Sequence, residues 1–133
     1  MTEIFRILVV DDNQDFADGV AIVLRSMGND VRVAHDGFEA LEIAAAFQPE
    51  VAFVDIGMPK LNGYQLARRL REWRWTRHAV LIAVTAWGED EDRVRAKEAG
   101  FDHHVTKPIE LESIARLLTE FAPADAGDGP PGP

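Results

Sequence analysis

The chain has 133 residues, of which 47% are hydrophobic and 28% are charged, proportions typical of a single globular domain. Its formal net charge of −9 disfavours direct binding to nucleic acid, and the absence of cysteine excludes disulfides and thiolate metal sites. Apolar runs are too short to span a bilayer and the first residues lack a signal-peptide pattern, so we expect a cytoplasmic protein without membrane contact.

Short apolar runs alternate with helical patterns along the chain. The runs predict strands at Ile7–Val10, Val31–Ala34, Val51–Val54 and Val80–Val84, with a fifth, shorter strand near Val105. Because these runs are apolar on both faces, they are typical of a parallel sheet that is covered on both sides.

The segments between the strands carry helix start and stop signals. The predicted boundaries are Asn13 and Gly28, Asp36 and Pro49, Asn62 for the third helix, the vicinity of Glu89 and Gly100 for the fourth, and Leu111 to Leu118 for the last. Asp36 with Glu39 resembles a capping box. Five strands that alternate with five helices predict an α/β fold, a doubly wound parallel sheet with right-handed crossovers.

Polar residues stand at the ends of four predicted strands. Asp11 and Asp12 follow the first strand, Asp55 ends the third, Thr85 ends the fourth and Lys107 follows the fifth. Each alone fits an ordinary structural role, but the carboxyl ends of parallel strands meet at one edge of a sheet. Carboxylates gathered there repel one another unless positive charge lies among them. The set therefore predicts a hard divalent cation beside Lys107.

These residues lie in motifs that resemble a known family. The motifs are Val9-Val10-Asp11-Asp12-Asn13, Asp55-Ile56-Gly57-Met58-Pro59 followed by Gly63, Thr85-Ala86, and Thr106-Lys107-Pro108. In this order and spacing the chain resembles the receiver domain of two-component response regulators, from Ile4 to about Phe121. The resemblance implies a flavodoxin-like (βα)5 fold. The stretch Asp102-His103-His104 is similar to receivers attached to hybrid sensor kinases, whereas a start at Met1 favours a free-standing or N-terminal receiver.

The resemblance implies a phosphorelay role. Asp55 would accept a phosphoryl group from a histidine kinase or a phosphotransfer protein. Thr85 and Lys107 would hold the phosphoryl oxygens, and the peptide bond before Pro108 would be cis. Carboxylate is a poor nucleophile, so the reaction would depend on positioning and on neutralising charge.

The same resemblance implies a metal site. Asp12, Asp55 and the backbone carbonyl of Gly57 would ligate Mg²⁺, or Mn²⁺ in its place, and Asp11 would help through water. Mg²⁺ suits this role because it accepts few protein carboxylates and keeps coordinated waters.

Four positions are candidates for switching or modulation: His104, Trp87, Ala86 and Pro108. In the family, an aromatic residue three positions before the lysine usually turns inward on phosphorylation, and His104 stands there in this chain. His104 is shorter than tyrosine and can be charged near neutral pH, or it is an ordinary polar residue of an edge strand. We hypothesise that Trp87 restricts attacking water; a packed or partner-facing role stays open.

We expect the receiver to span residues 1–121 and residues 122–133 to form a flexible Pro/Gly/Ala tail or truncated linker. The tail is too short for an output domain, so an unidentified partner or an attached domain would receive the signal. It would do so at the face formed by the fourth helix, the fifth strand and the fifth helix.

Two other function classes fit less well. A degenerate receiver that only binds proteins would not need the complete set of acids, threonine and lysine. A Mg²⁺-dependent phosphohydrolase would need a second acid where Gly57 stands, and a flavodoxin would need a Ser-, Thr- and Gly-rich loop where Asp11 and Asp12 stand. We therefore expect a signalling domain that only phosphorylates and dephosphorylates itself, unless it is cut from a hybrid histidine kinase.

Overall fold

The computed structural model describes residues 4–58, 60–74, 76–86, 90–107, 109–110 and 112–119. Five parallel strands form one sheet in the order β2-β1-β3-β4-β5. They are β1 (Arg6–Val10), β2 (Asp30–Ala34), β3 (Val51–Asp55), β4 (Val80–Thr85) and β5 (His103–Thr106). The helices are α1 (Gln14–Ser26), α2 (Gly37–Phe47), α3 (Gly63–Glu72) and α4 (Asp90–Ala99), followed by a last helix over residues 112–119. The predicted doubly wound fold is confirmed.

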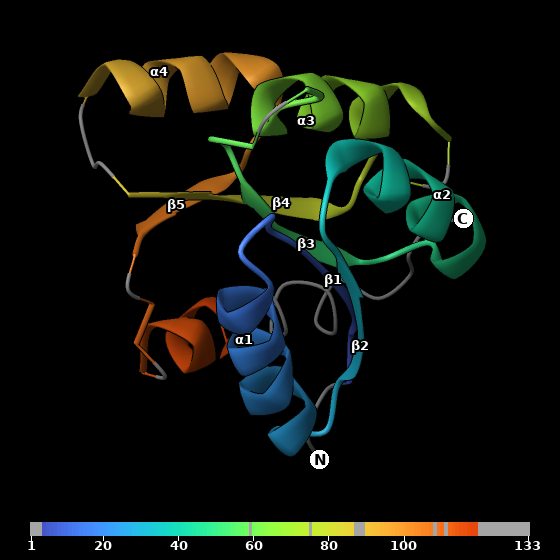
Figure 1. The fold of residues 1–133 in the computed structure, drawn as a ribbon, viewed down its shortest axis with the longest axis vertical. Coiled ribbons are helices and arrows are strands. Elements are labelled where there is room, and N and C mark those ends of the chain that lie inside the picture. The colour runs from blue at the N-terminus through green and yellow to red at the C-terminus, as the bar shows by residue number, and fades with distance from the viewer. Residues whose placement is uncertain are drawn as a thin grey trace.

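Helices cover both faces of the sheet. Figure 1 shows α2, α3 and α4 on one face, and α1 with the last helix on the other. Successive strand residues point to opposite faces. Leu8 and Val54 accordingly belong to the core beneath α2, α3 and α4, whereas Ile7 and Phe53 belong to the core beneath α1. All four side chains are at most 1% exposed, which explains why the central strands appear as continuous apolar runs.

Three helices begin at the predicted cap residues, which are Asn13, Asp36 and Asn62. The side chain of Asn13 accepts a hydrogen bond from the Phe16 N–H at 3.1 Å, which starts α1. Asn62 accepts one from the Gln65 N–H at 3.0 Å, and the Gln65 side chain accepts one from the Asn62 N–H at 2.9 Å. This reciprocal capping box fixes the start of α3 close to the end of β3.

The cap of α2 differs in detail from the predicted box. Asp36 accepts the Glu39 N–H at 2.8 Å, as expected. The Glu39 side chain accepts the N–H of His35, the residue before the cap, at 2.6 Å. At its other end α2 stops at Phe47, and Gln48 adopts a left-handed conformation (φ 51°) before Pro49. Within the described ranges, each helix is too short or too polar to cross a bilayer.

Gly63 allows α3 to start directly against the end of β3. A Cβ atom at this position would lie 2.5 Å from Ile56 Cα and 2.6 Å from the Asp55 carbonyl oxygen. Both are backbone atoms, so neither can turn away as a side-chain end would. The glycine therefore fixes the backbone that carries Asp55.

Gly63→Ala is expected to lower the free energy of unfolding by about 1–3 kcal/mol, because its methyl group would force the Asp55 backbone to move. Gly19 is the matched control: it is exposed in α1, and no atom lies within 4 Å of where its Cβ would stand. Gly19→Ala should raise the free energy of unfolding by about 0.5–1 kcal/mol. Urea denaturation followed by circular dichroism measures both changes. A Gly63→Ala variant as stable as the parent would contradict this packing.

Candidate functional site

Three carboxylates meet at the carboxyl edge of the sheet. Asp11 follows β1 and Asp55 ends β3, and these two strands are neighbours with Val10 paired to Val54. One oxygen each from Asp11, Asp12 and Asp55 lie within 4.8 Å of one another. Asp11 and Asp55 are buried and Asp12 is exposed. The structure therefore brings together the acids that strand-end positions predicted.

Lys107 reaches this cluster from the segment after β5. Its Nζ lies 2.9 Å from Asp11 Oδ2 and 3.9 Å from Asp55 Oδ2. Its backbone N–H donates to the Thr85 carbonyl at 2.8 Å, which ties this segment to the end of β4. The lysine thus forms its closer ion pair with Asp11 and stands within reach of Asp55.

Each buried acid uses its two oxygens differently. Asp11 Oδ1 accepts a hydrogen bond from the Asn13 N–H at 2.9 Å, and Asp55 Oδ1 accepts one from the Gly57 N–H at 2.9 Å. The Oδ2 atoms of both acids are the ones that approach Lys107. Local backbone therefore orients each carboxylate and leaves its second oxygen facing the lysine.

An aromatic residue that the sequence patterns did not assign to the site also holds the lysine. Lys107 Nζ lies 4.4 Å from the ring centroid of Phe16, in the first turn of α1. The negative face of an aromatic ring attracts an ammonium group. In the sequence, Phe16 is only one apolar position of an amphipathic helix, so its spacing gives no sign of this contact.

The surroundings of Asp55 raise the pKa of its carboxyl group from 3.8 to about 6. Burial is the main cause, because it disfavours the charged carboxylate. Repulsion from Asp11 and Asp12 acts in the same direction, whereas the Gly57 N–H and Lys107 lower the pKa. The lysine therefore compensates only part of the negative charge. An acidic oxygen cluster with uncompensated charge is the donor set that Mg²⁺ prefers.

A cavity of about 380 Å³ opens beside Asp55. It is lined by Asp55, Ile56, Gly57, Tyr64, Thr85, Ala86, Arg95 and Lys107. Thr85 is buried at the end of β4 and Ala86 after it is exposed. Thr85 and Lys107 thus line the same cavity as Asp55, in agreement with their predicted place at one sheet edge, and Gly57 and Ala86 line it as well. Tyr64 of α3 and Arg95 of α4 also line it, and no motif in the sequence pointed to them.

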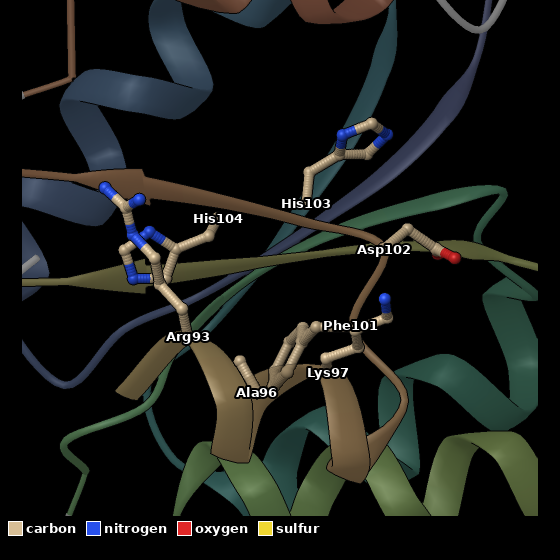
Figure 2. Close-up of a pocket in the computed structure, with 7 residues that line it drawn as sticks. All are labelled: Arg93, Ala96, Lys97, Phe101, Asp102, His103 and His104. Atoms are coloured by element: carbon tan, nitrogen blue, oxygen red, sulfur yellow. The ribbon is translucent and has the colours of Figure 1, made fainter. Parts of the chain in front are cut away.

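His104 lies at a different cavity. This second cavity, of about 560 Å³, separates α4 from β5, and Arg93 and Phe101 line it with His104. Figure 2 shows His104 and Arg93 among the residues that line this cavity, while the side chain of His103 points to the opposite side of the strand. Trp87 and Pro108 lie outside the described residues, as do Glu89, Leu111 and the predicted tail over 122–133.

Comparisons with known sequences give one family. The model of the response regulator receiver domain matches residues 7–119. The chain is 35% identical over 123 residues to a 14.6 kDa protein of Leptolyngbya boryana. This alignment covers 90% of this chain and 94% of that protein. It is 35% identical over 127 residues to response regulator MprA of Mycobacterium tuberculosis, over 92% of this chain and 54% of MprA. The chain is also 33% identical to the regulator RpaA of Synechocystis, over 82% of this chain and 45% of RpaA. It thus spans about half the length of these two regulators.

Solved structures agree with the sequence comparisons. A CheY-like receiver domain protein from Methanospirillum hungatei matches with a TM-score of 0.85 and 25% identity, over 96% of this chain and all (100%) of that one. The receiver domain of sensor histidine kinase PA1611 from Pseudomonas aeruginosa, solved with magnesium in its active-site cleft, matches with a TM-score of 0.81 and 28% identity, over 90% and 98%. This chain therefore belongs to the receiver domains of two-component response regulators, which are signalling domains rather than classical enzymes.

Proposed function

We propose that this chain is a Mg²⁺-dependent phospho-acceptor, in which Asp55 takes a phosphoryl group from a histidine kinase or a phosphotransfer protein. One observation carries the proposal. Asp55 lines a cavity, shares an oxygen cluster with Asp11 and Asp12, and lies 3.9 Å from Lys107. Acceptor, candidate metal ligands and cation therefore occupy one site.

The acids would hold Mg²⁺, or Mn²⁺ in its place, with a division of roles. Asp12, Asp55 and the carbonyl of Gly57 would be direct ligands, and Asp11 would act through water. The ion supplies positive charge against the transferring phosphoryl group. Asp12 and Gly57 are exposed while Asp55 is buried, so the ligand set runs from the surface into the cavity.

The transfer step uses the Asp55 oxygen that faces Lys107. Asp55 Oδ1 is held by the Gly57 N–H, so we assign the attack on phosphorus to Oδ2. A new P–O bond forms while the P–N bond to the donor histidine breaks, and the imidazole leaves with the electron pair. Lys107 then neutralises a phosphoryl oxygen, and the Thr85 hydroxyl donates a hydrogen bond to another.

The phosphoryl group adds about −1.5 to −2 charges to the cavity. Attraction of Thr85 toward it would shift the start of the β4–α4 connection, and Ala86 follows directly. The change would reach the face formed by α4, β5 and the last helix, where His104 lies (Figure 2). An output partner or an attached domain would bind that face.

Incubation with Mg²⁺ and acetyl phosphate should add one phosphoryl group to the chain, measured by intact mass spectrometry. Asp55→Asn should abolish the gain because it removes the attacking carboxylate, and a chelator should abolish it by removing the cation. Asp30→Asn is the matched control, because Asp30 is an exposed acid at the start of β2, the opposite end of that strand from the site. An unmodified wild type, or a full gain in Asp55→Asn, would contradict the proposal and favour a phosphorylation-independent binding module.

Without metal, Asp55→Asn is expected to be more stable than the wild type at about pH 8, by up to about 3 kcal/mol. The pKa of Asp55 is about 6 in the folded protein, above its ordinary 3.8. The folded state therefore binds the carboxyl proton of Asp55 more tightly than the unfolded state does. The wild type therefore loses stability as pH rises from 3.8 to about 6, and the variant lacks this loss. Urea denaturation with chelator at about pH 4 and about pH 8 measures the difference. A stability gain that is equal at both pH values would show that the ionised carboxylate is not the cause.

Phe16→Leu should slow phosphorylation by acetyl phosphate about two- to fivefold, because the ammonium group of Lys107 loses its aromatic support. Phe16→Tyr, which keeps the ring, should restore the wild-type rate. Phe38 provides the control: it is 56% exposed on α2, and Phe38→Leu should leave the rate unchanged. If Phe16→Leu and Phe16→Tyr slow the reaction equally, packing at this position rather than the ring contact with Lys107 would be responsible.

A further inference from the structure

The cavity beside Asp55 has a second cation that the proposed transfer does not use. Arg95 of α4 lines it together with Asp55 and Lys107. Its guanidinium carbon lies 4.4 Å from the centroid of the Tyr64 ring, and Tyr64 is 7% exposed. Arg95 is itself exposed, and at the cavity wall it packs against this buried aromatic ring.

The cavity is larger than a phosphoryl group needs. A phosphoryl group has four heavy atoms, which fill roughly 120 Å³ if each takes about the 30 Å³ of a water molecule in the liquid. The cavity measures about 380 Å³. The leaving group of a phosphoryl donor therefore fits in the same space that Arg95 lines.

Arg95 contacts the Tyr64 ring through its guanidinium carbon, which lies over the ring. A ring that supports the flat face of a guanidinium does not occupy the N–H donors, which lie in the guanidinium plane. Those donors match the two oxygens of a carboxylate in a bidentate pair. Arg95 is thus positioned to bind a carboxylate without giving up its contact with Tyr64.

We propose that Arg95, held by Tyr64, forms a subsite for the carboxylate leaving group of acyl phosphates. The inference rests on the proposed role of Asp55 as the phospho-acceptor. In the transfer, an Asp55 oxygen forms the new P–O bond, the P–O bond to the acyl group breaks, and the carboxylate leaves with the electron pair beside Arg95. No proton is required.

Two phosphoryl donors with different leaving groups distinguish the contribution of Arg95 from that of the rest of the site. Acetyl phosphate releases acetate, which is an anion. Phosphoramidate releases ammonia, because the P–N bond breaks after the nitrogen has taken a proton, and ammonia is neutral. Arg95 stabilises the first leaving group and not the second, so the ratio of the two rate constants reports on the subsite.

The test measures both rate constants by intact mass spectrometry in the presence of Mg²⁺. Arg95→Ala should slow the reaction with acetyl phosphate about three- to tenfold and that with phosphoramidate less than about twofold. Arg95→Lys, which keeps the charge without the planar fork, should give an intermediate ratio. Arg93→Ala removes the same charge from the same helix, but Arg93 lines the cavity between α4 and β5 (Figure 2), so it should leave the ratio unchanged.

The outcomes separate the two proposals. An unchanged ratio in Arg95→Ala, or a change of the same size in Arg93→Ala, would overturn the subsite while Asp55 remains the acceptor. Failure of the wild type to react with either donor would overturn the acceptor role itself, and the subsite with it. Circular dichroism of each variant establishes that a lost rate is not lost folding.

Discussion

The close approach of Asp11, Asp12 and Asp55 at one sheet edge is the constraint on which the site depends. The order β2-β1-β3-β4-β5 makes β1 and β3 neighbours, so the acids that follow them meet. Lys107 offsets part of their repulsion, and the pKa of Asp55 stays raised, at about 6. The folded chain thus keeps a region of uncompensated negative charge. Such a region reduces stability and at the same time prepares the site for a cation.

Aromatic rings contact Lys107 and Arg95, two cationic residues that line the cavity beside Asp55. Lys107 lies over Phe16 and Arg95 lies over Tyr64, each at 4.4 Å from the ring centroid. Phe16 belongs to α1 on one face of the sheet, and Tyr64 belongs to α3 on the other. The two hydrophobic cores therefore extend to the site and fix its charged groups. A ring contacts each of these two flexible side chains without adding another carboxylate, which would repel Asp11, Asp12 and Asp55.

Arg93 and Arg95 of helix α4 line different cavities. Arg95 lines the one beside Asp55, and Arg93 lines the one against β5 that contains His104. At 3.6 residues per turn, positions two apart lie on nearly opposite sides of a helix. The helix thus contributes one side to the cavity beside Asp55 and another side to the cavity against β5. Asp102, at the edge of the second cavity, is already paired with Arg71 at 2.7 Å, so its charge is compensated there.

The sequence by itself determined the strands, the helix caps and the acids with Thr85 and Lys107, because these follow from local rules. Hydrogen bonds at a cap span three residues, strand periodicity spans two, and strand ends in a parallel sheet share one edge. Only the tertiary structure decided that Phe16 contacts Lys107, that Tyr64 and Arg95 line the cavity beside Asp55, and that His104 lines a different cavity. These contacts join residues far apart in the chain. Their formation depends on how each helix is rotated and placed on the sheet, which periodicity alone does not specify.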